Sequence, residues 1–110
     1  MGYQLQVRDR ATQDLRSYAN YILSAGNADA AVRFLEAAEQ TFNQLAETPN
    51  IGKVVAIADK AFGDVRQWHI RNFKNHLIFY RLDQETVDIL RVLHGARDLG
   101  DIIPFLDELS

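Results

Sequence analysis

The segment NHLIFYRLDQETVDILRVLHGARD, residues 75–98, decides the fold of this chain of 110 residues. Two apolar runs, 77–82 and 87–93, flank a polar break at residues 83–85, and this pattern predicts a β-hairpin with a short loop. The first run is apolar at both alternating sets of positions, so neither face of the sheet is suited to water alone. We therefore expect both faces of this sheet to be covered.

A third strand is predicted just before this hairpin, because residues 64–73 alternate in polarity and complete an antiparallel three-stranded meander. We expect a two-residue turn at Lys74 and Asn75, since Asn tolerates positive φ, and a three-residue loop at 83–85. This register sets Tyr80 between His69 and Asp88. The face expected to receive helices carries Trp68, Ile70, Leu77, Phe79, Val87, Ile89 and Leu93. The other face carries His69, Arg71, Ile78, Tyr80, Asp88, Leu90, Val92 and His94.

Upstream of the meander, residues 3–8 alternate as a half-buried strand, and two amphipathic helices follow. Asp9 and Asn27 are expected to cap the two helices, and Gly26 suits the left-handed conformation between them. The apolar stripe of the first helix is Ala11, Leu15, Tyr18, Ala19 and Ile22. That of the second, residues 27–47, is Ala31, Leu35, Ala38, Phe42 and Leu45, widened by Phe34 and Ala37. A link this short predicts an antiparallel helical hairpin.

The predicted fold class is therefore α+β. It has an N-terminal strand, an antiparallel helical hairpin and an antiparallel three-stranded meander forming one sheet. Residues 50–63 remain open between a short strand and an ordered loop. The tail, 100–110, is expected to form a short helix or lid, with Pro104 in its first turn. The length favours a single domain over residues 1–110.

Composition limits the function. There is no cysteine, which excludes disulfides and thiolate chemistry, and the three histidines are not spaced as metal ligands. No glycine-rich phosphate loop is present, so we expect no cofactor and no metal. A net charge of −3 argues against sequence-specific nucleic-acid binding. Without a signal peptide or an apolar run of about 18 residues, we expect a cytoplasmic protein with no membrane contact.

The three segments DAAVRFLEAAEQTFNQLAETPNIG (29–52), NHLIFYR (75–81) and ILRVLHGARDL (89–99) resemble a ParE toxin of the RelE/ParE type II toxin–antitoxin superfamily. The likeness runs from about Val7 to Leu99, within a family core expected at about residues 3–99. It implies a small α+β toxin of a plasmid-stabilisation system, neutralised by a ParD-like antitoxin that wraps an extended and helical segment over it. ParE members poison DNA gyrase, whereas the RelE branch cleaves messenger RNA on the ribosome.

Two modes of action are weighed on these residues. A ribonuclease needs groups that move protons and hold phosphate, for which His69, Arg71, Tyr80, His94 and Arg97 are the candidates. Against it stand the net acidity and Asp88 placed beside Tyr80. Resemblance to the RelE branch would also imply a basic cluster completed by an aromatic residue, often Tyr, near the C-terminus, and no tyrosine follows Tyr80 here. We therefore expect a non-enzymatic toxin that inhibits growth by binding, and we keep a ribonuclease and an inactive relic that only binds its antitoxin as alternatives.

The partner surface is predicted from charge and exposure. The candidate partner-binding residues are Arg66, His69, Arg71, Tyr80 and Arg97. An acidic or mixed antitoxin segment with spaced apolar anchors is expected along an exposed sheet edge and the helical hairpin, forming a hetero-oligomer. Trp68 is expected in the core, and His76 in solvent at the hairpin turn. Arg91 and Arg97 are expected in structural roles, pairing with carboxylates such as Asp98 or capping carbonyls.

Overall fold

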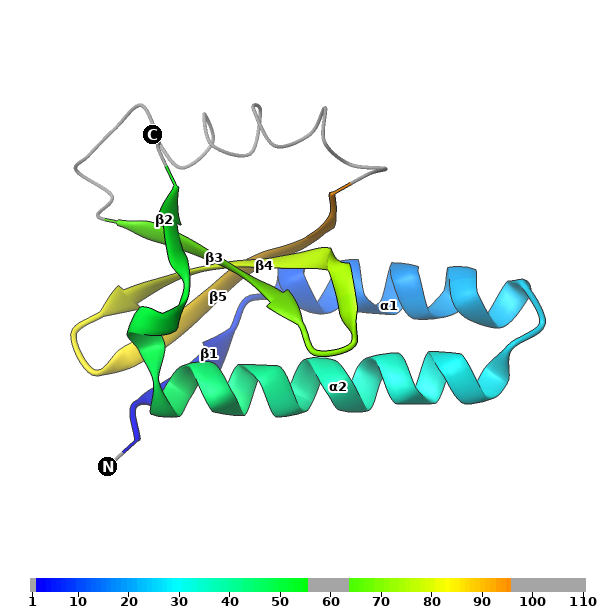
Figure 1. Cartoon of the computed structure of the whole chain (residues 1–110), viewed down its shortest axis with the longest axis horizontal. Coiled ribbons are helices and arrows are strands. Elements are labelled where there is room, and N and C mark those ends of the chain that lie inside the picture. Colours follow the sequence, from blue (N-terminus) through cyan, green and yellow to red (C-terminus); the bar gives the residue numbers. More distant parts are fainter. Residues whose placement is uncertain (1, 56–63, 96–110) are drawn as a thin grey trace.

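The computed structural model describes residues 2–55 and 64–95. The elements in chain order are β1 (Gln4–Val7), α1 (Asp9–Ser24), α2 (Ala28–Glu47), the 3-10 turn η1 (Pro49–Ile51), β2 (Lys53–Val55), β3 (Val65–Ile70), β4 (Phe73–Asp83) and β5 (Thr86–His94). Figure 1 shows α1 and α2 side by side and antiparallel, next to a twisted sheet. Neither described helix is long and apolar enough to cross a membrane.

The strands form one sheet in the order β1-β5-β4-β3-β2. Strands β3, β4 and β5 pair antiparallel as the predicted meander, and β2 adds antiparallel to β3. β1 pairs parallel with β5, so the sheet as a whole is mixed. Parallel neighbours need a long crossover, and here the helical hairpin lies in the connection that leads from β1 to the meander.

The predicted antiparallel hairpin of two helices is confirmed, but the residue that caps its first helix differs from the prediction. Asn27 caps α2, since its Oδ1 accepts a hydrogen bond from the Ala30 amide at 3.0 Å, and Gly26 adopts φ 88° between the helices. Arg8, however, occupies the N-cap position of α1 without a side-chain cap bond, so the cap predicted at Asp9 was wrong. Asp9 lies in the first turn, where a carboxylate still favours the positive end of the helix dipole.

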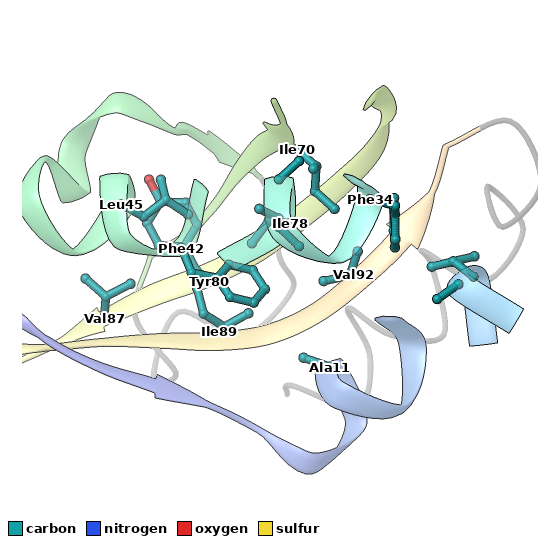
Figure 2. Close-up of a cluster of buried hydrophobic side chains, with 14 residues drawn as sticks. Ala11, Phe34, Phe42, Leu45, Ile70, Ile78, Tyr80, Val87, Ile89 and Val92 are labelled. Atoms are coloured by element: carbon teal, nitrogen blue, oxygen red, sulfur yellow. The ribbon is translucent and has the colours of Figure 1, made fainter. Parts of the chain in front are cut away.

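The main core lies between the helices and one face of the sheet (Figure 2). Phe34, Phe42 and Leu45 of α2 are buried there, and Ala11 contributes from α1. Leu35, which the sequence pattern placed in the stripe, is 43% exposed. Thr41 lies on the buried side instead. Its hydroxyl can be buried there because it donates a hydrogen bond to the Ala37 carbonyl at 2.7 Å.

The first turn of the meander lies three residues earlier than predicted. Arg71 and Asn72 connect β3 to β4, with Asn72 at φ 67°, whereas Lys74 and Asn75 lie inside β4. Tyr80 consequently pairs with Arg66, not with His69. An odd shift exchanges the two faces of one strand relative to its neighbour.

The second loop is also shorter than predicted. Gln84 and Glu85 form it alone, with Gln84 at φ 56°, and Asp83 pairs with Thr86. A register shift between Phe79 and Tyr80 then places Tyr80 opposite Ile89 and leaves Arg81 opposite Asp88. Asp88 is therefore not the strand partner of Tyr80.

These corrections rearrange the two faces of the sheet. The cluster beneath the helices includes Trp68, Ile70, Ile78, Tyr80, Val87, Ile89 and Val92. Val65, Phe79, Leu90 and Leu93 form a second cluster, against which Val55 and Leu77 pack. The helix-facing positions predicted for Leu77, Phe79 and Leu93 were wrong, as were the opposite positions predicted for Ile78, Tyr80 and Val92. The segment left open, 50–63, contains the end of η1 and the short strand β2, while residues 56–63 and the tail lie outside the described residues.

Candidate partner-binding site

Tyr80, predicted at the surface, is fully buried. Its Oη donates to the Pro49 carbonyl at 2.7 Å and accepts from the Gly52 amide at 2.9 Å. Burial raises the pKa of Tyr80 above its ordinary value of 10.0, and the Gly52 hydrogen bond and the charge of Arg66 oppose this to a smaller extent. The phenol therefore fixes the chain around η1 and is not available to a partner.

Arg66 lies next to this buried phenol, as the strand partner of Tyr80. Its Nη1 donates to the Gly52 carbonyl at 2.8 Å and to the Asn50 carbonyl at 3.3 Å. Gly52 is needed here, because a Cβ at this position would lie 2.8 Å from Cε1 of the Tyr80 ring. Arg66 and Tyr80 together hold residues 49–52 against the sheet.

His69 and Arg71 line a hollow of about 560 Å³ between α2 and the β3–β4 turn. The rest of its lining consists of Gln40, Thr41, Gln44, Trp68 and Asn72. The Arg71 amide donates to Thr41 Oγ1 at 3.1 Å, which ties the turn to the helix. We call this the α2–β3 hollow.

A second hollow of about 370 Å³ adjoins the first, since Gln40 and Asn72 line both. Arg33, Glu36, Ala37 and Phe73 complete it. Beside the first hollow, β2 pairs only with residues 65–67 of β3, so the outer edge of β3 beyond Gln67 has no pairing with β2. A sheet edge and two hollows along α2 thus meet at one surface.

His94 lies elsewhere, on β5 beside α1. Its amide donates to Tyr18 Oη at 2.8 Å, and its ring centroid is 4.6 Å from that of His76. The predicted position of His76 in a hairpin turn was wrong, because His76 lies within β4 and its ring contacts those of Tyr18 and Phe34 at 5.0 and 4.8 Å. His94 lies two strands from β3 in the sheet order, whereas His76 lies on β4, the neighbour of β3.

Arginines on the other strands make carboxylate pairs. Arg91 has the predicted structural role, pairing through Nε with Asp14 at 2.8 Å. Asp14 also accepts from the Val92 amide at 3.0 Å, so it satisfies the backbone of β5 where β1 no longer pairs with it. The buried carboxylate of Asp88 accepts from both Arg8 and Arg81.

Comparison with known proteins decides the family. The family described as "ParE toxin of type II toxin-antitoxin system, parDE" matches residues 5–99, which is most of the chain. The chain belongs to this ParE toxin family.

The fold agrees with the ParE assignment. A solved structure described as "Chromosomal ParDE TA system from P. aeruginosa" has a TM-score of 0.68 to this chain at 15% sequence identity. The alignment covers 84% of this chain and 95% of that chain. No curated protein sequence matches this chain.

The ParE fold of this chain brings together only part of the predicted site. His69 and Arg71 share the α2–β3 hollow, and Arg66 lies on the same strand as His69. Tyr80 lies in the core, His94 lies beside α1, and Arg97 is outside the described residues. Sequence reasoning missed Gln40 and Gln44, although their spacing of four residues beside the apolar stripe was a usable sign of a polar helix flank.

Proposed function

We propose that this ParE-family protein is the toxin of a plasmid-stabilisation system, and that it acts in the cytoplasm by binding and poisoning DNA gyrase. Membership of the ParE family over residues 5–99 is the observation that carries this proposal. The resemblance stated above supplies gyrase as the target.

Binding is favoured over RNA cleavage because the side chains named for a nuclease do not converge. The hydroxyl of Tyr80 donates a hydrogen bond to the Pro49 carbonyl inside the core, and His94 lies in an aromatic cluster beside α1. Of the four named residues that the structure describes, only His69 and Arg71 line the same hollow. General acid–base catalysis needs both groups within hydrogen-bonding reach of one reacting site.

The antitoxin is proposed to be ParD-like and to dock where the β3 edge meets α2. An extended segment there can pair with the backbone beyond Gln67, while its side chains enter the adjoining hollows. Arg71 lines the first hollow, where an acidic side chain of the segment would complement it, whereas Arg33 in the second hollow has Glu36 beside it. Arg66, Arg71 and Arg97 are the proposed basic complement, which speeds association more than it deepens affinity.

Co-expression with the neighbouring small reading frame tests the partnership. We expect the two proteins to elute together in size exclusion, and glutamine substitution of Arg66, Arg71 and Arg97 to slow association and flatten its salt dependence. Arg10→Gln is the matched control, because Arg10 is an exposed arginine on α1. Separate elution, or an equal effect of the control, contradicts this interface. Arg66→Gln is also measured alone, since it loosens residues 50–52.

Expression in cells separates the proposal from its alternatives. The toxin alone should arrest growth, and co-expression of the antitoxin should restore it. An inactive relic leaves growth normal. A RelE-like ribonuclease produces cut messenger RNA on ribosomes, whereas the proposed binding toxin leaves that messenger intact.

A further inference from the structure

The lining of the α2–β3 hollow is positively charged, whereas the chain as a whole is negatively charged. None of its seven residues is acidic, although the chain carries 15 Asp and Glu residues and a net charge of −3. Arg71 contributes a full positive charge, and Gln40, Gln44 and Asn72 contribute amides. The adjoining hollow differs, because Glu36 lies beside Arg33 there. An anion is therefore tolerated in the first hollow and opposed in the second.

Two aromatic side chains lie on the β3 side of the same hollow. The rings of Trp68 and His69 have centroids 4.9 Å apart and planes inclined by 32°. Both rings are half-buried and both line the hollow. At this separation the two rings stack on each other, so a planar base would extend this stack against one ring and would not lie across both. Base–aromatic stacking tolerates any base because each has a π-face.

The helix side of the hollow offers the complementary polar groups. Gln40 and Gln44 are one turn apart on α2, so their amides lie on one side of the helix. An amide side chain can donate and accept at once, which matches the N6 and N7 edge of adenine. The hydroxyl of Thr41 accepts a hydrogen bond from the Arg71 amide, so the backbone of the turn that carries Arg71 is fixed against α2.

We propose that the α2–β3 hollow binds a nucleotide. The base extends the stack formed by Trp68 and His69. Its polar edge meets Gln40 and Gln44, and the phosphate is held by Arg71 with the side-chain amide of Asn72. A volume of about 560 Å³ lies within the usual range for small-ligand sites of about 300 to 1,000 Å³. Nucleotide binding at this site does not depend on gyrase poisoning. It can be tested on the free protein whether or not an antitoxin covers the same surface in a complex.

An acidic peptide could also satisfy Arg71, but it leaves the aromatic wall without a flat partner. The source of the nucleotide is either a free mononucleotide or one unit of a single strand. Both share the chemistry of a planar base joined to a phosphate, so the experiment below separates them.

Calorimetric titration of the whole chain with AMP tests the proposal, with adenosine, inorganic phosphate and UMP as comparisons. Trp68 is the single tryptophan of the chain, so its fluorescence reports binding at this position independently. We expect saturable AMP binding with a dissociation constant of about 1 mM or tighter. Adenosine and phosphate should each bind about tenfold more weakly, because each supplies half of the contacts. UMP should bind more weakly than AMP, because it lacks the N6 and N7 edge of adenine.

Two variants locate the ligand. Arg71→Gln should weaken AMP binding about tenfold and leave adenosine unchanged, because an arginine–phosphate hydrogen bond is charge-assisted. Arg10→Gln, on the far helix, should change neither. An oligoadenylate that binds about tenfold more tightly than AMP identifies a single strand as the source, and equal affinity identifies the free nucleotide. The proposal is overturned if no nucleotide binds saturably, if Arg71→Gln leaves the AMP affinity unchanged, or if only an acidic peptide binds.

Discussion

The environment of Tyr80 differs from the exposed one that was predicted from the sequence. In an alternating strand its hydroxyl could face either water or the core, and the sequence contains no mark of the two backbone groups it meets near residue 50. The structure buries it, and its hydroxyl serves both the Pro49 carbonyl and the Gly52 amide. A polar group is stable in a core only when such partners are present.

Tyr80→Phe tests this contact. Removing the hydroxyl leaves two buried backbone groups without it, so the free energy of unfolding should fall by about 2 kcal/mol. Tyr3→Phe is the control, since Tyr3 is 37% exposed. Gly52→Ala should also destabilise the protein, and less so in the Tyr80→Phe background if the hydroxyl is the obstacle. Strictly additive losses in urea unfolding would contradict this packing.

The raised pKa of Tyr80 predicts a stability loss in alkali. The folded state holds the phenol proton more tightly than the unfolded chain does, because burial disfavours the phenolate. This contribution is complete below pH 10.0, the ordinary pKa, and is lost as the pH rises through the folded pKa. Unfolding free energies measured across this range should fall more steeply for the natural chain than for Tyr80→Phe. Parallel curves would show that Tyr80 does not cause the loss.

Asp88 is a buried carboxylate, only 3% exposed, and its arginine partners are Arg8, at the N-cap position of α1, and Arg81 of β4. Replacing Arg8 and Arg81 by Met leaves this charge without its paired arginines, at a cost of about 3 kcal/mol. Adding Asp88→Asn to that double variant should recover part of the loss, because the uncompensated charge is gone. If the triple variant has the same urea midpoint of unfolding as the double variant, or a lower one, then the ion pairs of Asp88 do not stabilise the fold.

At the scale of elements, turn chemistry explains the main errors of sequence reasoning. Arg71-Asn72 and Lys74-Asn75 are equivalent turn signals three residues apart, and local propensity cannot choose between them. The Arg71 amide bonds to Thr41, which is 30 residues away, and such a contact cannot be read from local sequence. The second loop was misjudged because Gln84, which adopts φ 56°, is not a usual residue for that conformation.

The helix stripe yields a matched stability test. Phe42 is 5% exposed and lies in the main core, whereas Leu35 is 43% exposed on the same helix. Phe42→Ala should lower the free energy of unfolding by about 3 to 5 kcal/mol, and Leu35→Ala by about 0.5 kcal/mol. Similar losses from the two changes would show that the buried face of α2 is assigned incorrectly.

For the whole molecule, periodicity and resemblance together predicted the fold class, the helical hairpin, the meander and the ParE family. They did not predict that β1 is parallel to β5, since strand order depends on contacts between the two ends of the chain. The site was predicted in part: His69 and Arg71 come together, but Gln40 and Gln44 join them from a helix 25 or more residues earlier. Pairing register, not composition, decided which side chains share a surface.

Poisoning of DNA gyrase through direct binding is the activity that we propose for this protein. Purified protein added to a gyrase supercoiling reaction, across a wide concentration range, tests this most directly. We predict loss of supercoiling together with accumulation of cleaved DNA held by gyrase, and reversal of both when the co-purified antitoxin is added. Full supercoiling and no cleaved complex at every concentration, with a protein that still arrests growth, would contradict the claim.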